Sequence, residues 1–224
     1  MMRPDRFLYK AIHWTYRRFR RSFDQVYTRW LFSIHQVDLG PGLDCRGIPD
    51  IYISRGGKMN VGSGLILNNG RYHNMAGREQ NCLFAVYGGE LSIGNNVGMS
   101  SVAIVCTDRI VIGDNVRIGG SACIYDSDFH SLDPVERAAL PEIVDHVQTK
   151  PVILENDCFI GNHVTILKGV RIGARSVVGS SSLVARSIPP DEIWAGNPAR
   201  FIRKIDDAFL TQLKKNQARA LAEL

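Results

Sequence analysis

The fold of this chain is decided by residues 154–203, LENDCFIGNHVTILKGVRIGARSVVGSSSLVARSIPPDEIWAGNPARFIR, in which an aliphatic residue recurs every six positions. The aliphatic positions are Leu154, Ile160, Ile166, Ile172, Val178 and Val184. Glycine directly follows three of them, at positions 161, 173 and 179. A period of six matches neither the 3.6 residues of a helical turn nor a sustained strand alternation, so the segment is predicted to consist of short, repeated strands.

Such repeats are expected to wind into a coil. Three sides of six residues make one triangular turn, and the next turn stacks on it at strand spacing, about 4.8 Å. Each buried aliphatic side chain then lies above its equivalent in the next turn, and glycine occupies corners where a Cβ atom would collide with the backbone. The sequence therefore predicts a mainly β protein built as a parallel β-helix.

Several motifs of this stretch are also found together in a known family, namely Phe159-Ile160-Gly161-Asn162-His163-Val164, Val178-Gly179-Ser180, Ile188-Pro189-Pro190, Trp194-Ala195-Gly196-Asn197-Pro198-Ala199-Arg200 and Ile202-Arg203. With them the chain resembles the bacterial hexapeptide-repeat acyltransferases, and most closely the galactoside/maltose acetyltransferases and the polysaccharide O-acetyltransferases. The resemblance is strong over residues 86–205, weak over 37–85 and absent from the first 35. It implies a left-handed β-helix, a homotrimer, and acyl-CoA bound in the groove between neighbouring subunits.

The 224 residues, 45% of them apolar, are enough for one β-helix with appendages. We expect a helical extension over 1–36, the β-helix over 37–205 with an extruded loop at 125–150, and a helix over 206–224 that caps the last coil. Residues 37–67 are interrupted by glycine and proline and predict irregular early coils, followed by a loop over 68–80. Farther along, the six-residue pattern predicts buried positions at Met99, Val105, Ile112 and Ile118. The five cysteines contain no C-x-x-C pair, so reduced, buried thiols are expected.

The net charge of +5 originates in the N-terminal segment, because residues 1–30 contain eight Lys/Arg and two Asp, a net of +6. The same segment has an apolar stripe at helical spacing, formed by Leu8, Ile12, Tyr16, Phe19, Phe23, Val26, Trp30 and Ile34. Two interpretations are open. Residues 6–34 could lie on an anionic inner-membrane surface, or the helix could pack on its own trimer. With no signal peptide and no long apolar run in the sequence, we expect a cytoplasmic protein, peripheral at the inner membrane under the first interpretation. No nucleic-acid partner is expected.

The loop 125–150 carries the candidate catalytic residue, His130. Transfer from a thioester to a sugar hydroxyl requires a base, and a neutral imidazole can accept the hydroxyl proton and pass it to the leaving thiolate. Asp126 and Asp128 are candidates for fixing the tautomer of His130 or for binding a sugar hydroxyl, and Ser101 is a further candidate for the acceptor. His163 is a weaker alternative for a ligand contact. Cys123 and Cys158 flank the loop but are predicted to be core residues, since a thioester donor needs no acyl-enzyme.

For the donor, the resemblance implies contacts from Asn162, Ser180, Ala185, Arg186, Arg200 and Arg203. Arginine is suited to the phosphates of CoA because its planar fork gives paired, charge-assisted hydrogen bonds. Ala185 has no hydroxyl, so only its backbone could contact the donor. Acetyl-CoA is expected as a substrate rather than as a permanently bound cofactor, and no metal site is expected, because no pair of histidines lies five positions apart.

The sequence thus predicts an acetyl-CoA-dependent O-acetyltransferase that acts on a sugar, and surface-polysaccharide biosynthesis is the expected context. Residues that the galactoside enzymes use near positions 99–107 are missing here, which makes a small free galactoside a doubtful acceptor. Two alternatives stay open. One is N-acetylation of an amino-sugar nucleotide, and the other is a non-catalytic trimeric scaffold.

Overall fold

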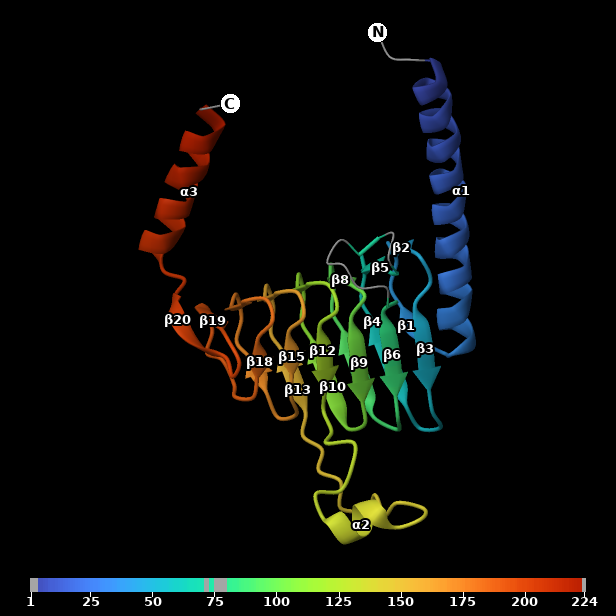
Figure 1. The fold of residues 1–224 in the computed structure, drawn as a ribbon, viewed down its shortest axis with the longest axis vertical. Coiled ribbons are helices and arrows are strands. Elements are labelled where there is room, and N and C mark those ends of the chain that lie inside the picture. The colour runs from blue at the N-terminus through green and yellow to red at the C-terminus, as the bar shows by residue number, and fades with distance from the viewer. Residues whose placement is uncertain (1–3, 71–72, 75–79, 223–224) are drawn as a thin grey trace.

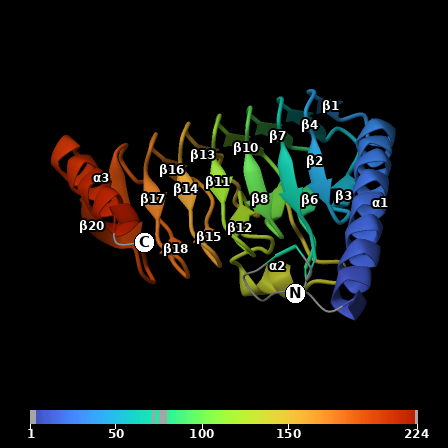
Figure 2. The same ribbon diagram turned by 90° about the horizontal axis from the view of Figure 1, so that it is seen from above.

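The computed structural model describes residues 4–70, 73–74 and 80–222 and shows a stack of triangular coils with a helix at each end (Figure 1). Helix α1 (Pro4–Ile34) precedes the stack, α3 (Asp207–Ala222) follows it, and a long loop containing α2 (Pro134–Ala138) leaves it in the middle. The coils lie one beside the next along a single axis, so the molecule is elongated (Figures 1 and 2).

Three sheets of six, eight and six described strands form the sides of the prism, and neighbouring strands are parallel except for the last pair. The first sheet, A, contains β1 (Asp38–Leu39), β4 (Lys58–Val61), β7 (Glu90–Ile93), β10 (Arg109–Ile112), β13 (Val152–Leu154) and β16 (Arg171–Ile172). Sheet B contains β2 (Asp44–Arg46), β5 (Ile66–Asn68), β8 (Gly98–Ser100), β11 (Arg117–Ile118), β14 (Phe159–Ile160), β17 (Val177–Val178), β19 (Glu192–Ala195) and β20 (Arg200–Lys204). Sheet C contains β3 (Asp50–Ile53), β6 (Leu83–Val86), β9 (Ala103–Cys106), β12 (Cys123–Tyr125), β15 (Thr165–Ile166) and β18 (Leu183–Val184).

The six-residue repeat accounts for the core. Leu154 pairs with Ile172, Ile160 with Val178 and Ile166 with Val184, so each aliphatic side chain is stacked on its equivalent 18 residues later. All six side chains are fully buried. At the corners, a Cβ atom on Gly161 would lie 2.6 Å from the backbone nitrogen of Ser180, which explains why glycine follows the aliphatic residue there.

The early coils are more regular than the sequence predicts. Strands β1 to β5 lie within residues 37–68 and join the same three sheets as the later ones, so the expectation of irregular coils is wrong. Glycine and proline lie at their corners and leave the strands between them intact. Val105 was the expected inward residue of β9, but Ile104 and Cys106 point inward instead. A shift of one residue turns every side chain of a strand to the other face, and the coil length changes at this point.

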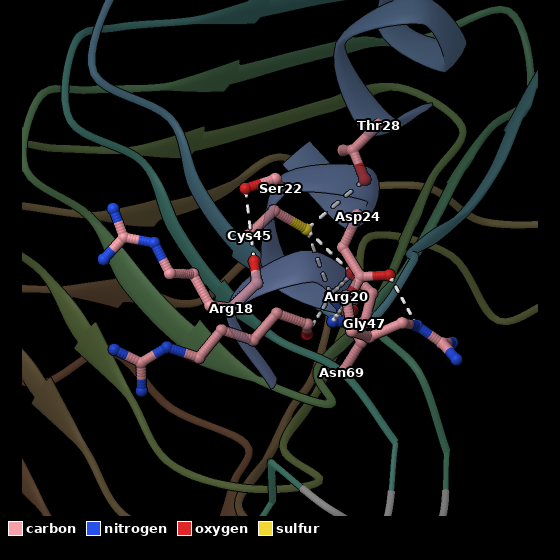
Figure 3. Close-up of polar contacts among 9 residues, drawn as sticks. Arg18, Arg20, Ser22, Asp24, Thr28, Cys45, Gly47 and Asn69 are labelled. Carbon is pink, nitrogen blue, oxygen red and sulfur yellow. Dashed lines mark hydrogen bonds and ion pairs between the residues drawn. The ribbon is translucent and has the colours of Figure 1, made fainter. Parts of the chain in front are cut away.

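Helix α1 covers the first coil with a mainly polar face (Figure 3). The buried carboxylate of Asp24 accepts hydrogen bonds from the backbone N–H of Gly47 at 2.8 Å and from Arg20 at 3.0 Å. Thr28 lies 3.4 Å from the thiol of Cys45, whose pKa burial raises to about 11. One turn later, Phe32 enters the core and packs on Phe84 with ring centroids 6.4 Å apart.

The predicted apolar stripe of α1 is largely exposed. Phe19 is 75% exposed and Val26 is 70% exposed, although they lie at the centre of the stripe. The N-terminal part of the helix also extends past the edge of the coils (Figures 1 and 2). No helix within the described residues is both long and apolar enough to cross a membrane.

Helix α3 does not cap the last coil as predicted. It stands away from the prism in Figure 1, and its described side chains Leu210 and Leu213 are 41% and 47% exposed. The open edge of sheet B is covered instead by β20, which pairs antiparallel with β19. An added strand satisfies the backbone groups of an edge directly, so a helix is not needed for that purpose.

Candidate active site

The extruded loop leaves the prism at the corner between sheets C and A, after β12 and before β13. Its neck is a short ribbon, in which Ser127 bridges Thr149 and the backbone N–H of Asp128 donates to Gln148 at 3.1 Å. Farther out, Asp133 caps helix α2 by accepting the N–H of Val135 at 2.8 Å. The loop is therefore an ordered projection with its own hydrogen bonds.

His130 lies beyond this neck and is held by one carboxylate. Its Nδ1 is 2.9 Å from Oε2 and 3.2 Å from Oε1 of Glu142. Because a carboxylate accepts, Nδ1 carries the proton in this pair, and the lone pair of a neutral ring is then on Nε2. The hydrogen bond from His130 also lowers the pKa of Glu142, which keeps that carboxylate ionised at neutral pH. The side chain of His130 is 65% exposed, so Nε2 is open to a substrate.

A second pair of the same kind lies beside the first. Nδ1 of His146 is 2.5 Å from Oε1 of Glu136, and this contact raises the pKa of His146. The hydrogen bonds from Ser131 and then His146 lower the pKa of Glu136. Ser131 links the two pairs, because its hydroxyl donates to Glu136 at 2.5 Å and its N–H donates to Glu142 at 3.3 Å. Sequence reasoning missed Glu142, Glu136 and His146, since no spacing rule connects residues ten or twelve positions apart in an irregular loop.

Asp126 has a different role from the predicted one. It is fully buried, and its carboxylate accepts the N–H groups of Thr107 and Asp108 and the hydroxyl of Thr107, all at 2.8–3.0 Å. These bonds fix the corner of the preceding coil, and they leave the carboxylate neither on the ring of His130 nor open to a sugar. Glu142, not Asp126 or Asp128, fixes the tautomer.

Asp128 ties the loop to the coil that follows it. One oxygen lies 2.5 Å from Nζ of Lys168, and the other is buried without a hydrogen-bond partner among the described residues. The role of Asp128 in acceptor binding stays a prediction. Ser101 is fully buried, and its hydroxyl likewise has no partner within the described part of the chain.

The remaining candidates lie along two further parts of the prism. Asn162 and Ser180 lie at the corner between sheets B and C, stacked one coil apart, and the side chain of Asn162 accepts the N–H of Gly120 at 2.7 Å. Ala185 and Arg186 follow β18, at the same corner as the loop, and both are exposed. Arg200 and Arg203 lie on β20, where the guanidinium of Arg203 stacks over Phe209 at 3.9 Å.

One chain therefore does not bring all the candidates together. The loop with His130 is at the corner between sheets C and A, whereas Asn162 and Ser180 are at the corner between B and C. His163 also lies at that second corner, where its backbone is left-handed (φ 58°) and its Nδ1 is buried without a described partner.

The two cysteines that flank the loop lie in the wall of the prism. Cys158 is buried with its pKa raised to about 11 by burial, and Cys123 lies on β12 in the sheet, half-buried. A thiol with a raised pKa is a poor nucleophile at neutral pH. The described residues contain no group of three His, Cys, Asp or Glu side chains that could hold a metal ion.

Comparison with known proteins connects this geometry to a family. Residues 151–186 match the family model for the bacterial transferase hexapeptide, six repeats. Over 122 residues the chain is 34% identical to galactoside O-acetyltransferase of Escherichia coli, a match that covers 54% of this chain and 57% of that enzyme. The chain thus spans little more than half the length of this curated relative.

Two solved structures share the architecture. The hexapeptide-repeat acetyltransferase VCA0836 of Vibrio cholerae is 28% identical with a TM-score of 0.52, and the match covers 84% of this chain and 82% of that one. AntD, an N-acyltransferase of Bacillus cereus solved with dTDP and coenzyme A, is 20% identical with a TM-score of 0.60 over 86% of this chain and 96% of its own, a likeness of fold. Together with the three parallel sheets, these matches confirm the predicted fold class and resemblance: the chain is a left-handed β-helix protein that carries the bacterial transferase hexapeptide repeat and is similar to the hexapeptide-repeat acetyltransferases.

Proposed function

We propose that this protein is an acyl-CoA-dependent O-acetyltransferase that transfers an acetyl group to a hydroxyl of a sugar, in the biosynthesis of a surface polysaccharide. The observation that carries the proposal is the pairing of His130 with Glu142 on an ordered, projecting loop, which leaves Nε2 as an exposed base. The similarity to galactoside O-acetyltransferase supports the donor and the acceptor class.

The reaction follows from this arrangement. Nε2 of His130 accepts the proton of the acceptor hydroxyl while the oxygen attacks the thioester carbonyl. The tetrahedral intermediate then collapses with cleavage of the carbon–sulfur bond, and the imidazolium returns the proton to the thiolate of CoA. Glu142 stabilises the imidazolium that forms between the two steps, as a carboxylate on Nδ1 does in other histidine-dependent transferases and hydrolases.

We further propose that the site is shared between copies in a homotrimer. His130 lies at one corner of the prism, and the residues that the family resemblance assigns to CoA, Asn162 and Ser180, lie at another. If neighbouring prisms associate side by side, the loop of one copy reaches the corner between sheets B and C of the next. His130 of one copy and the CoA-binding residues of the next then lie in the same groove between two copies.

The test is an assay of thiol release from acetyl-CoA with a panel of hydroxyl and amino sugars, free, nucleotide-linked and lipid-linked. We expect His130→Ala to lower kcat by about 10²–10⁴-fold, the usual contribution of a general base. His146→Gln, which changes the other imidazole of the same loop, is the matched control and should stay within about threefold. A loss under threefold for His130→Ala would refute the assignment.

The panel also separates the alternatives. Acetylation of amines but not of hydroxyls would replace the proposal by N-acetylation, which the same base could serve. Absence of acetyl-CoA binding in calorimetry, together with no thiol release for any acceptor, would favour a non-catalytic scaffold.

A further inference from the structure

Exposed apolar side chains follow one face of α1 and form a surface, hereafter the outer stripe, that consists of Leu8, Ile12, Tyr16, Phe19, Phe23, Val26, Trp30 and Ile34. Each of these eight side chains is between 51% and 75% exposed. Large apolar side chains that follow one helix face without a covering element mark an interaction surface.

The outer stripe cannot turn toward its own prism, because the opposite face of α1 is already bound there. Arg21 pairs with Asp44 at 2.7 Å, Asp24 accepts the N–H of Gly47, and Phe32 lies in the core. At 3.6 residues per turn, Phe32 and Thr28 are each about 160° around the helix from Trp30. Figure 3 shows the anchored side, with Asp24 and Thr28 pointing at Cys45 and Gly47.

The position of α1 in the fold determines which way the outer stripe faces. The helix lies across the end of the coil stack, and its anchored side faces the first coil (Figures 1 and 2). The outer stripe therefore faces away from the stack, beyond its N-terminal end. Copies that associate side by side with parallel prisms would present their stripes on the same side, as one surface.

The residue types and the charges of α1 indicate which kind of partner binds the outer stripe. The stripe and its edge are rich in aromatic residues, including Tyr16, Phe19, Phe23 and Trp30, of which Tyr and Trp are suited to the boundary between lipid and water. Its flanks carry arginines, among them Arg18, Arg20 and Arg29, and residues 1–30 have a net charge of +6. The only carboxylates of this segment are Asp5 and Asp24, and Asp24 is buried against Gly47.

A second copy of α1 would bring like charges together, because residues 1–30 contain eight Lys/Arg against two Asp. An anionic surface complements the same charges and accepts the apolar residues. We propose that α1 binds the surface of an anionic lipid bilayer through its outer stripe, with the prism standing on the membrane by its N-terminal end. The helix lies on the bilayer and does not span it, since no described helix has the length and apolar content to cross.

The test is flotation of the full-length protein with vesicles of phosphatidylcholine alone or with added phosphatidylglycerol, without acetyl-CoA or acceptor. We expect binding only to the anionic vesicles, and weaker binding as salt is added. Phe19→Asp should lower the partition coefficient at least about tenfold, because a buried phenyl ring is replaced by a charge. Leu213→Asp, at an exposed leucine of α3, is the matched control and should bind like the wild type.

Wild-type protein that stays unbound with anionic vesicles at low salt would overturn the proposal, as would equal binding by Phe19→Asp. The third measurement is the mass in solution by analytical ultracentrifugation. A drop in mass for Phe19→Asp would also overturn the proposal, because the stripe would then be a contact between copies. None of these measurements depends on catalysis, so the outcome is independent of the proposed acetyl transfer.

Discussion

Glu142 lies twelve residues after His130 in the chain, yet its carboxylate receives the Nδ1–H of that histidine at 2.9 Å. The loop folds back on itself to make this contact, and the N–H of Ser131 donates to the same carboxylate. A histidine held in this way keeps one tautomer and one orientation, which the proposed role of His130 as general base requires.

Replacing Glu142 tests whether this contact matters for chemistry or only for the shape of the loop. Glu142→Gln keeps the size of the side chain but removes the charge that stabilises the imidazolium. We expect kcat to fall about ten- to a hundredfold, less than the roughly 10⁴-fold seen in a buried triad, with KM for acetyl-CoA unchanged. Steady-state kinetics provides the measurement. Glu136→Gln, in the neighbouring pair, should leave kcat within about threefold; an equal loss in both variants would point to a structural role for Glu142.

Mixing two inactive variants tests whether the site is shared. His130→Ala removes the proposed base, and Ser180→Arg places a bulky side chain at the corner between sheets B and C where the donor is expected. If the site combines residues of two copies, co-expression of the two variants restores a measurable part of the activity, because some grooves then contain both wild-type residues. Each variant expressed alone serves as the reference. No recovery in assemblies shown by mass to be mixed would mean that one chain supplies the whole site.

The pair of His146 and Glu136 has a pH dependence with a defined sign. The contact raises the pKa of His146 above its ordinary value of 6.5, and the hydrogen bonds from Ser131 and His146 lower the pKa of Glu136 below 4.5. The pair therefore contributes its full stabilisation of the loop between the two ordinary pKa values. That contribution is lost as the pH rises through the raised pKa of His146, and also as the pH falls through the lowered pKa of Glu136. Titration of the His146 ring protons by NMR should show the raised pKa, and Glu136→Gln should return it toward 6.5. An unchanged midpoint in that variant would contradict the contact.

Asp24 anchors α1 to the first coil, so its replacement should lower the free energy of unfolding. Asp24→Ala leaves the part-buried N–H of Gly47 without its acceptor, and we expect a loss of about 1–3 kcal/mol in the free energy of unfolding. Urea denaturation followed by circular dichroism measures it. Ser22→Ala, on the same helix, removes only a hydrogen bond to the carbonyl of Arg18 at the exposed surface and should change stability by less than about 0.5 kcal/mol.

The stacked core makes a further prediction for β15. Ile166 is fully buried between Ile124 and Val184 of the neighbouring coils. Ile166→Ala should cost about 2–5 kcal/mol, because the cavity cannot close when the coils on both sides are held by backbone hydrogen bonds. Thr165→Ala, the next residue, faces outward and serves as the control. Similar losses in both variants in thermal denaturation would contradict the inward and outward assignment.

The core and the extruded loop differ in how far the sequence predicts their structure. The period of six placed Leu154, Ile160 and Ile166 in the core, because a repeat leaves the same side chain in the same position of every coil. No comparable rule exists for the loop, where Glu142 and His146 are near their partners only because the chain folds back. The same holds for Asp126, whose acidic side chain suggests a site but whose burial under Thr107 makes it a structural residue.

By itself, the sequence determined the coil, its core and the presence of a basic amphipathic helix, because each of these follows from a regular spacing of residue types. Only the tertiary structure decided which side of α1 meets the prism. Within one chain, Asp24, Thr28 and Phe32 are the side that meets the prism, and Phe19 and Val26 face outward. The reason is that the backbone N–H of Gly47 and the thiol of Cys45 at the end of the first coil need polar partners, a requirement that arises only once the coil exists.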